Sequence, residues 1–166
     1  GNPVVMTPYS VSYYNMKPDP NGKGPGHNDS YMSLKMNYDF DPAPPRYSAE
    51  QRKNIIGYQP CVWTEYIPTT KDLEFVLLPR LSAASEVSWT EVKSKNFEDF
   101  KRRLAKQHFK RLDVMKTNYF VDPPQDAQLN LFTDKIKTSI KTDFPKAKIF
   151  YQEYKSGKYT KAQEYK

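Results

Sequence analysis

Two short apolar runs predict the strands of the amino-terminal half. Residues 4–6, Val-Val-Met, are flanked by proline-containing segments and indicate a short buried strand. Residues 55–63 indicate a second strand, in which Gly57 marks a close backbone approach. Residues 17–30 between them are rich in proline and glycine and predict a loop. Three prolines in residues 41–45 exclude both helix and central strand there.

Local start signals predict three helices. Ser48 and Gln51 have the spacing of a capping box and open a short helix. Thr69 opens a longer apolar helix, which Pro79 should kink by removing one backbone hydrogen bond. Asn96 is the predicted N-cap of the third helix. The order of strand, loop, helix, strand and two helices is typical of an α/β layered fold.

The third helix carries most of the positive charge and is amphipathic. The whole chain has a formal charge of +7, of which residues 93–116 contribute +6. At ~100° per residue, the apolar positions fall on one arc: Phe97, Phe100, Leu104, Ala105, His108, Phe109, Leu112 and Met115. The basic residues fall opposite: Arg102, Arg103, Lys106 and Lys110. Nucleic-acid binding favours aromatic residues among exposed basic ones, so we expect a solvated face and no nucleic-acid partner.

Two alternatives depend on this helix. A basic interaction module would show nucleic-acid binding with a steep salt dependence. His108 lies within the apolar arc, and we interpret it as a hydrogen-bonded core histidine rather than a ligand.

Residues 122–124, Asp-Pro-Pro, predict a boundary. Short strands are expected after it, at residues 129–132, 135–142 and 148–154. Their spacing suggests a β-sandwich, but three or four strands do not complete one. We therefore predict an α/β domain over residues 1–120 and an incomplete sandwich over residues 121–166.

Composition excludes several classes of site. A single cysteine excludes an internal disulfide framework and a cysteine-rich zinc site, and two histidines leave little for a metal, so we expect neither metal nor cofactor. No apolar run approaches ~20 residues, so no membrane span is expected. The glycine-rich residues 22–27 lack the spacing of a phosphate-binding loop.

Candidate chemistry follows each predicted strand. Trp63 and Glu65 end the second strand, and Tyr13, Tyr14 and Asn15 follow the first. The carboxyl ends of barrel strands are where α/β barrels build their sites. Residues two apart project to the same side of a strand, so an indole and a carboxylate could hold one sugar. On this pattern alone, a core tryptophan beside a surface glutamate is the alternative.

Residues 2–120 resemble the family-20 glycoside hydrolases, the β-N-acetylhexosaminidases. The resemblance is carried by an ordered set of segments: Val4 to Asn15, Ile55 to Gln59, Trp63 to Ile67, Leu77 to Leu81, Ala84 to Val87 with Trp89, Asn96 to Leu112, and Asn118-Tyr119. Residues 121–166 are similar to the start of the small Fn3-like sandwich that follows the barrel in many bacterial members.

The resemblance implies the last units of a (β/α)8 TIM barrel, strands 7 and 8 with their helices, followed by the incomplete sandwich. It implies removal of terminal, non-reducing β-linked N-acetylglucosamine or N-acetylgalactosamine. In this family the substrate's own acetamido oxygen attacks the anomeric carbon, with net retention. An Asp-Glu pair on strand 4 orients the acetamido group and protonates the leaving oxygen. This chain has no such pair, since Glu98-Asp99 has the reverse order on a surface helix.

The resemblance also implies residue roles. Tyr13 would hydrogen-bond the acetamido oxygen, with Tyr14 as the less favoured alternative; Trp63 would wall the pocket, and Glu65 would bind distal sugar hydroxyls. Asn15 stands where the family usually has aspartate, and an amide accepts a hydrogen bond more weakly than a carboxylate. That departure leaves a non-catalytic sugar-binding relative as the alternative.

The implied partners are a glycan or chitooligosaccharide with a terminal N-acetylhexosamine, and the rest of the same polypeptide. The resemblance implies a periplasmic or secreted protein, whose signal would lie before Gly1.

Overall fold

Two parallel strands form the base of the amino-terminal unit in the computed structural model, which describes residues 1–19, 24–124, 140–142, 144 and 147–165. Strand β1 (Val4–Met6) pairs in parallel with β4 (Ile55–Tyr58), with Met6 opposite Tyr58. A smaller parallel pair joins β2 (Met16–Lys17) to β3 (His27–Tyr31). The chain divides into two units, Gly1–Phe120 and Val121–Lys166.

Two strand predictions need correction. The strand expected over residues 55–63 ends at Tyr58; beyond it, the Gln59 N–H donates to the Met6 carbonyl at 3.0 Å and Cys61 forms an isolated bridge to Tyr13. The loop expected over residues 17–30 includes most of β3. Composition predicted a loop because it reports local backbone preference, whereas β3 forms by pairing with a strand from elsewhere in the chain.

The bounds of the helices are α1 (Tyr9–Ser12), α2 (Leu34–Asp39), α3 (Ala49–Lys53), α4 (Thr70–Leu77), α5 (Arg80–Trp89), α6 (Phe97–Arg103) and α7 (Phe109–Met115), with a 3₁₀ turn at Val92–Ser94 and a π turn at Leu104–His108. Three of the helices, α3, α4 and α6, begin at the predicted caps. Ser48 and Gln51 form the full capping box. Thr69 and Asn96 each accept a hydrogen bond from the backbone N–H three residues later.

The single kinked helix expected after Thr69 is two helices. Helix α4 ends at Leu77 and α5 begins at Arg80, with a cis peptide bond between Leu78 and Pro79. A proline ring clashes with the preceding turn and lacks the N–H that a continuous helix needs, so the chain breaks rather than bends. The break places Arg80 at the start of α5, facing the core.

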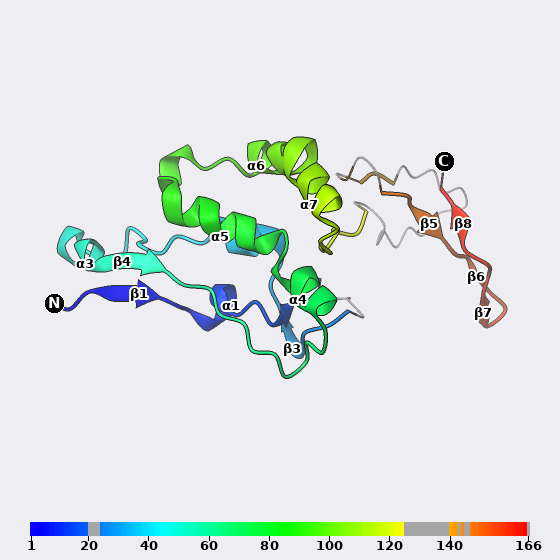
Figure 1. Ribbon diagram of the computed structural model, residues 1–166, viewed down its shortest axis with the longest axis horizontal. Helices are drawn as coiled ribbons and strands as arrows, with labels where there is room; N and C mark the ends of the chain where they lie inside the picture. The colour runs from blue at the N-terminus through cyan, green and yellow to red at the C-terminus, as the bar shows by residue number, and fades with distance from the viewer. Residues whose placement is uncertain (20–23, 125–139, 143, 145–146, 166) are drawn as a thin grey trace. The chain divides into compact units, whose positions relative to one another are not determined.

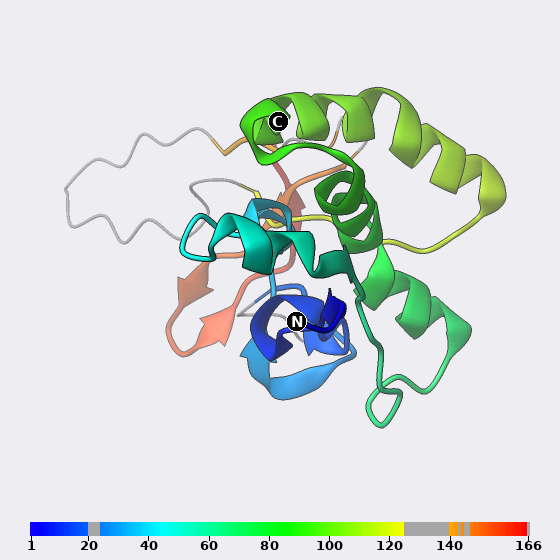
Figure 2. The same ribbon diagram turned by 90° about the vertical axis from the view of Figure 1, so that its left-hand side faces the viewer.

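Helix α5 lies between the β1–β4 pair and the α6–α7 helix (Figure 1), and the second view shows the same order (Figure 2). The predicted amphipathic face is confirmed by four buried residues: Phe100, Leu104, Phe109 and Leu112. Met115 was assigned to this face wrongly, because the helix ends there and its side chain is 60% exposed. His108 is half-buried, and its Nε2 lies 2.9 Å from the hydroxyl of Ser82, as expected for a hydrogen-bonded core histidine.

The second unit contains two antiparallel pairs among its described residues. Strand β5 (Phe150–Tyr151) pairs with β8 (Gln163–Glu164), and β6 (Tyr154–Lys155) pairs with β7 (Lys158–Tyr159). Ser156 and Gly157 turn the inner hairpin with φ of 50° and 80°, the positive values that a two-residue type I′ turn requires.

Of the three strands predicted in this unit, only the last lies entirely within the described residues. The strand expected over residues 148–154 is divided between β5 and the start of β6. The strand expected at residues 129–132 lies outside the described residues, as does that at 135–142 apart from 140–142. The sandwich stays a prediction.

Candidate functional site

The carboxyl ends of β1 and β4 lead into two segments that pair with each other. Beside the Tyr13–Cys61 bridge, the Tyr14 N–H donates to the Cys61 carbonyl at 2.9 Å. The Cys61 N–H donates to the Ser12 carbonyl at 2.8 Å. Trp63 follows two residues after Cys61. The structure therefore fixes the segment that holds Tyr13 beside the start of the segment that holds Trp63.

The two neighbouring tyrosines have different environments. Tyr14 is fully buried, and its hydroxyl donates to Asn37 Oδ1 at 2.8 Å and lies 3.1 Å from the Arg80 carbonyl. Burial, the main cause, raises the pKa of Tyr14 well above its ordinary value. Tyr13 is partly exposed, with its ring 5.0 Å from that of Tyr9. Of the two, Tyr13 can reach a ligand, whereas the Tyr14 hydroxyl is already used inside the core.

Asn15 carries an unused acceptor. Its side chain is 7% exposed, and its Oδ1 is buried without a hydrogen-bond partner among the described residues. The Asn15 backbone is fixed, because its carbonyl accepts the His27 N–H at 2.7 Å. A buried acceptor left unpaired costs roughly 1–3 kcal/mol, so a group that donates to it gains that energy back.

A short segment at Gly26 and His27 joins the two strand ends. The Gly26 N–H donates to the Tyr66 carbonyl at 3.2 Å, and the rings of His27 and Tyr66 meet edge to face at 5.1 Å. Gly26 has φ of +112°, and a Cβ there would lie 2.8 Å from the Asn15 carbonyl oxygen. Only glycine fits this position without strain. The segment thus ties the Asn15 turn to the loop that contains Glu65.

Trp63 and Glu65 lie in a loop and not on a strand, so the expected same-side projection from a strand does not apply. The Trp63 indole is 55% exposed. Burial, the main cause, raises the pKa of the Cys61 thiol, although the interaction with Trp63 acts to lower the pKa of that thiol. Glu65 is exposed, within a turn closed by the Ile67 N–H donating to the Thr64 carbonyl at 3.0 Å. Both side chains are accessible to a ligand.

Sequence reasoning missed Gly26 and His27. The glycines of residues 22–26 signalled turns, and they were considered only as a phosphate-binding loop. Their partners, Asn15 and Tyr66, come from different parts of the chain. A local signal cannot identify such partners, although the combination of two glycines around a proline does mark a backbone under unusual constraint.

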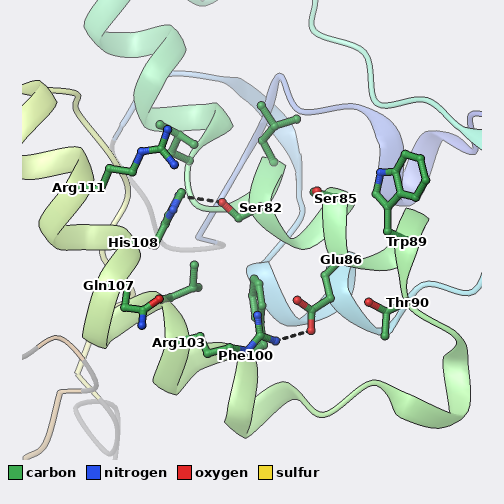
Figure 3. A pocket seen from close by; sticks show the side chains of 13 residues that line it. Ser82, Ser85, Glu86, Trp89, Thr90, Phe100, Arg103, Gln107, His108 and Arg111 are labelled. Atoms are coloured by element: carbon green, nitrogen blue, oxygen red, sulfur yellow. Dashed lines mark hydrogen bonds and ion pairs between the residues drawn. The ribbon is translucent and has the colours of Figure 1, made fainter.

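A hollow lies in the helical layer, apart from the strand ends (Figure 3). It is a groove of about 690 Å³ between α5 and α6–α7. Its walls include the Ser82–His108 pair and an ion pair of Glu86 with Arg103 at 2.5 Å. Burial lowers the pKa of His108, and the nearby positive charge of Arg111 adds to the effect. The residues that line it include none of Tyr13, Asn15, Trp63 or Glu65.

Metal-ligand geometry does not occur in the part of the chain that the structure describes, where no three His, Cys, Asp or Glu side chains cluster. In the same residues, no helix has the length and apolar character to cross a bilayer. The side chains near the strand ends include hydroxyl, amide, carboxylate, indole, thiol and imidazole groups.

Comparison with known proteins adds to this geometry. Residues 1–92 match glycosyl hydrolase family 20, catalytic domain. Over 153 residues the chain is 31% identical to a beta-hexosaminidase of Porphyromonas gingivalis, an alignment that covers 89% of this chain and 19% of that protein. A beta-N-acetylhexosaminidase of Cellulomonas fimi is 33% identical over 114 residues, which are 65% of this chain and 21% of that protein.

Solved structures agree in fold. The family-20 exo-β-N-acetylglucosaminidase of Vibrio harveyi, crystallised with N-acetylglucosamine, matches with a TM-score of 0.63 and 30% identity over 69% of this chain and 18% of that one. The chain spans about a fifth of the length of these relatives. Its mixed α/β fold is part of a TIM-barrel-type catalytic domain. With more than half of its residues matched to that domain, the chain belongs to glycosyl hydrolase family 20.

Proposed function

We propose that residues 1–120 supply strands 7 and 8, with their helices, to a (β/α)8 barrel within a longer polypeptide. That enzyme removes terminal, non-reducing β-linked N-acetylglucosamine or N-acetylgalactosamine from a glycan or chitooligosaccharide. Parallel pairing of β1 with β4 supports adjacent barrel strands, and the names of the relatives support the reaction. In the same proposal, residues 121–166 begin an Fn3-like sandwich, and the enzyme acts in the periplasm or outside the cell.

One observation carries the proposal. The Asn15 amide oxygen is buried and unpaired among the described residues, in the turn that the Gly26 link joins to the loop of Glu65. A sugar binds proteins through several hydroxyls and one apolar ring face. A free acceptor, an accessible carboxylate and an exposed indole near the ends of two adjacent strands match those needs.

The proposed mechanism uses the substrate's own nucleophile. The acetamido oxygen attacks the anomeric carbon as the bond to the leaving oxygen breaks, giving an oxazolinium-like intermediate that water then opens with retention. Tyr13 donates to the acetamido oxygen, Trp63 walls the pocket, and Glu65 and Asn15 accept from sugar hydroxyls. An Asp-Glu pair elsewhere in the polypeptide orients the acetamido group and protonates the leaving oxygen.

The test uses the complete polypeptide and two aryl glycosides. An aryl β-N-acetylglucosaminide should be hydrolysed with retention, whereas an aryl β-glucoside should not, because it lacks the acetamido nucleophile. Proton NMR of the first-formed sugar reads the anomer. Equal rates on both glycosides, or inversion, would contradict the substrate-assisted mechanism.

Asn15 also favours a second function, a sugar-binding relative without catalysis. An amide in place of the usual aspartate keeps a hydrogen bond but weakens it. The two functions differ in whether the complete polypeptide holds an Asp-Glu pair after a barrel strand. Binding of N-acetylglucosamine without hydrolysis of either aryl glycoside would select the second function.

Replacing Glu65 with glutamine should weaken recognition of the distal hydroxyls. The loss of a charge-assisted bond is worth roughly 1.5–3 kcal/mol, which is about ten- to 150-fold in kcat/KM. The penalty should shrink on a substrate that lacks the 4- and 6-hydroxyls. Glu50→Gln, on the exposed face of α3, is the matched control and should leave kcat/KM unchanged. The same penalty on the deoxy substrate would place the recognising carboxylate elsewhere.

Asn15→Asp should strengthen sugar binding or sharpen the choice between gluco and galacto epimers. A carboxylate accepts a hydroxyl hydrogen bond roughly twice as strongly as a neutral group, which suggests a gain of about 1 kcal/mol, or about fivefold in KM. KM for the two epimeric aryl glycosides, measured at pH 7, provides the check. Unchanged KM for both would mean that no sugar hydroxyl meets residue 15.

A further inference from the structure

Arg80 is a buried cation whose hydrogen-bond acceptors, among the residues that the structure describes, are all backbone carbonyls. It is 1% exposed, at the first position of α5. Its Nη2 donates to the carbonyls of Tyr14 at 2.7 Å and Met16 at 3.0 Å. Its Nη1 donates to the Met32 carbonyl at 3.0 Å, and its Nε to the Val76 carbonyl at 2.8 Å. One side chain therefore ties together three segments that are far apart in the sequence.

The charge has no carboxylate partner among the described residues. Burial lowers the pKa of Arg80 to about 10, so the guanidinium remains protonated at neutral pH. Burying an ion costs several kcal/mol unless hydrogen bonds compensate. An apolar side chain of similar volume would avoid this cost and pack as well. A buried guanidinium without a carboxylate partner among the described residues therefore indicates that the fold needs the hydrogen bonds of Arg80 rather than its volume.

Those bonds converge on the turn of the proposed sugar site. The Tyr14 and Met16 carbonyls lie on either side of Asn15, and Arg80 Nη2 holds both. The guanidinium carbon also lies 5.2 Å from the centre of the Tyr14 ring. The backbone before and after Asn15 is thus fixed from the core side, while the His27 N–H fixes the Asn15 carbonyl itself.

Lysine could not replace this arrangement. A guanidinium presents five N–H donors in a rigid plane, whereas an ammonium presents three from a single atom. The bonds from Arg80 leave from three different nitrogens in one plane. A lysine at this position keeps the charge, but its single nitrogen cannot take the places of Nε, Nη1 and Nη2 at once, so it loses the simultaneous hold on the Val76, Met32 and Tyr14 carbonyls.

We propose that Arg80 is a positioning residue of the sugar site. It holds the peptide units on both sides of Asn15, so that the amide oxygen of Asn15 stays directed at a sugar hydroxyl. Arg80 itself does not touch the sugar. That the ligand is a sugar rests on the proposed function. The hydrogen bonds from Arg80 to the carbonyls on either side of Asn15 do not depend on it.

The first experiment measures the turn without substrate. In the complete polypeptide, Arg80→Lys is compared with Leu112→Ala, which leaves a cavity in α7 and bonds nothing in the turn. Hydrogen exchange of the amides of Met16 and His27, bonded to the Tyr13 and Asn15 carbonyls, should be about tenfold faster in Arg80→Lys. In Leu112→Ala the exchange of these two amides should match the parent protein.

The second experiment measures the effect on catalysis. Arg80→Lys should lower kcat/KM on an aryl β-N-acetylglucosaminide by about tenfold, mainly through KM. In an Asn15→Ala background the same substitution should change KM less than twofold, because the residue through which it acts is gone. A merely structural role would give the same factor in both backgrounds.

A measurement on the unmodified protein covers the case in which Arg80→Lys does not fold. With ¹⁵N-labelled arginine, the Arg80 guanidinium signal is identified by its proximity to the Tyr14 ring, whose centre lies 5.2 Å from the guanidinium carbon. Saturating N-acetylglucosamine should shift that signal through the Tyr14 and Met16 carbonyls.

Three results would overturn the proposal: unchanged turn exchange in Arg80→Lys, equal factors in the two backgrounds, or an unmoved Arg80 signal when the sugar is bound. If the parent hydrolyses no aryl β-N-acetylglucosaminide, the proposed function fails by itself. The exchange comparison then still decides whether Arg80 holds the turn.

Discussion

Tyr13→Phe in the complete polypeptide should lower kcat by about 10²–10³ while KM changes little. The acetamido oxygen gives up electron density as it attacks, so a hydroxyl that donates to it acts by holding that oxygen in line with the anomeric carbon, and its loss lowers kcat more than binding. The partly exposed Tyr13, directly after α1, has this opportunity, whereas the Tyr14 hydroxyl is bonded to Asn37. Single-turnover kinetics on an aryl β-N-acetylglucosaminide would separate this chemical step from binding.

Tyr9→Phe is the matched control. The Tyr9 ring lies 5.0 Å from that of Tyr13, and its hydroxyl is 3.2 Å from that of Ser30 on the exposed surface. Removing this hydroxyl should change kcat by less than twofold. Equal kcat for Tyr13→Phe and the parent would remove Tyr13 from the mechanism.

The 166-residue chain by itself should be inactive and should associate. The chemical reason is that the proposed mechanism assigns protonation of the leaving oxygen to an Asp-Glu pair elsewhere in the polypeptide, and assigns Tyr13, Trp63 and Glu65 only to holding the sugar. The physical reason is that β1 and β4 pair only with each other among the described residues, which leaves their outer edges open. Val4 is 45% exposed and Ile56 is 66% exposed, positions that a closed barrel would cover.

Sedimentation velocity at several concentrations, with thermal unfolding on the same samples, tests this expectation. Association or a broad, concentration-dependent transition agrees with it. A sharp, concentration-independent transition from a monomer would show that the chain is a self-sufficient domain. Hydrolysis of an aryl β-N-acetylglucosaminide by the chain alone would show that the acid is present within it.

Local signals in the sequence predicted the local features of the fold. Ser48 and Asn96 begin helices where their capping chemistry indicates, because such bonds span only three residues. Helix α2 was missed, since its Ser33 cap precedes only six residues, too few for an apolar period to stand out. Strand β3 was missed because its partner β2 lies across a proline-rich stretch.

In the candidate site too, residues with a local sequence signal could be predicted, and a residue without one could not. Tyr13, Asn15, Trp63 and Glu65 were selected from their positions after strands and from a family resemblance, and the structure brings their two segments together at Cys61. Their roles stay predictions. Arg80 had no local signal, because Tyr14 is 66 positions away from it. A buried arginine within an apolar helix is recognisable only once the carbonyls that it meets are known.

The link through Gly26 has a consequence for how a sugar enters. The Gly26 N–H bonds the Tyr66 carbonyl, and the Gly26 backbone lies against the Asn15 carbonyl oxygen. An outward movement of the segment that holds Asn15 would therefore have to carry the loop of Tyr66 with it. In the proposed function this linked sugar site is preorganised, so little conformational entropy is lost when it is filled. Its occupancy should then be governed by diffusion and by the fit of the sugar ring, with no slow closing step on this side of the barrel.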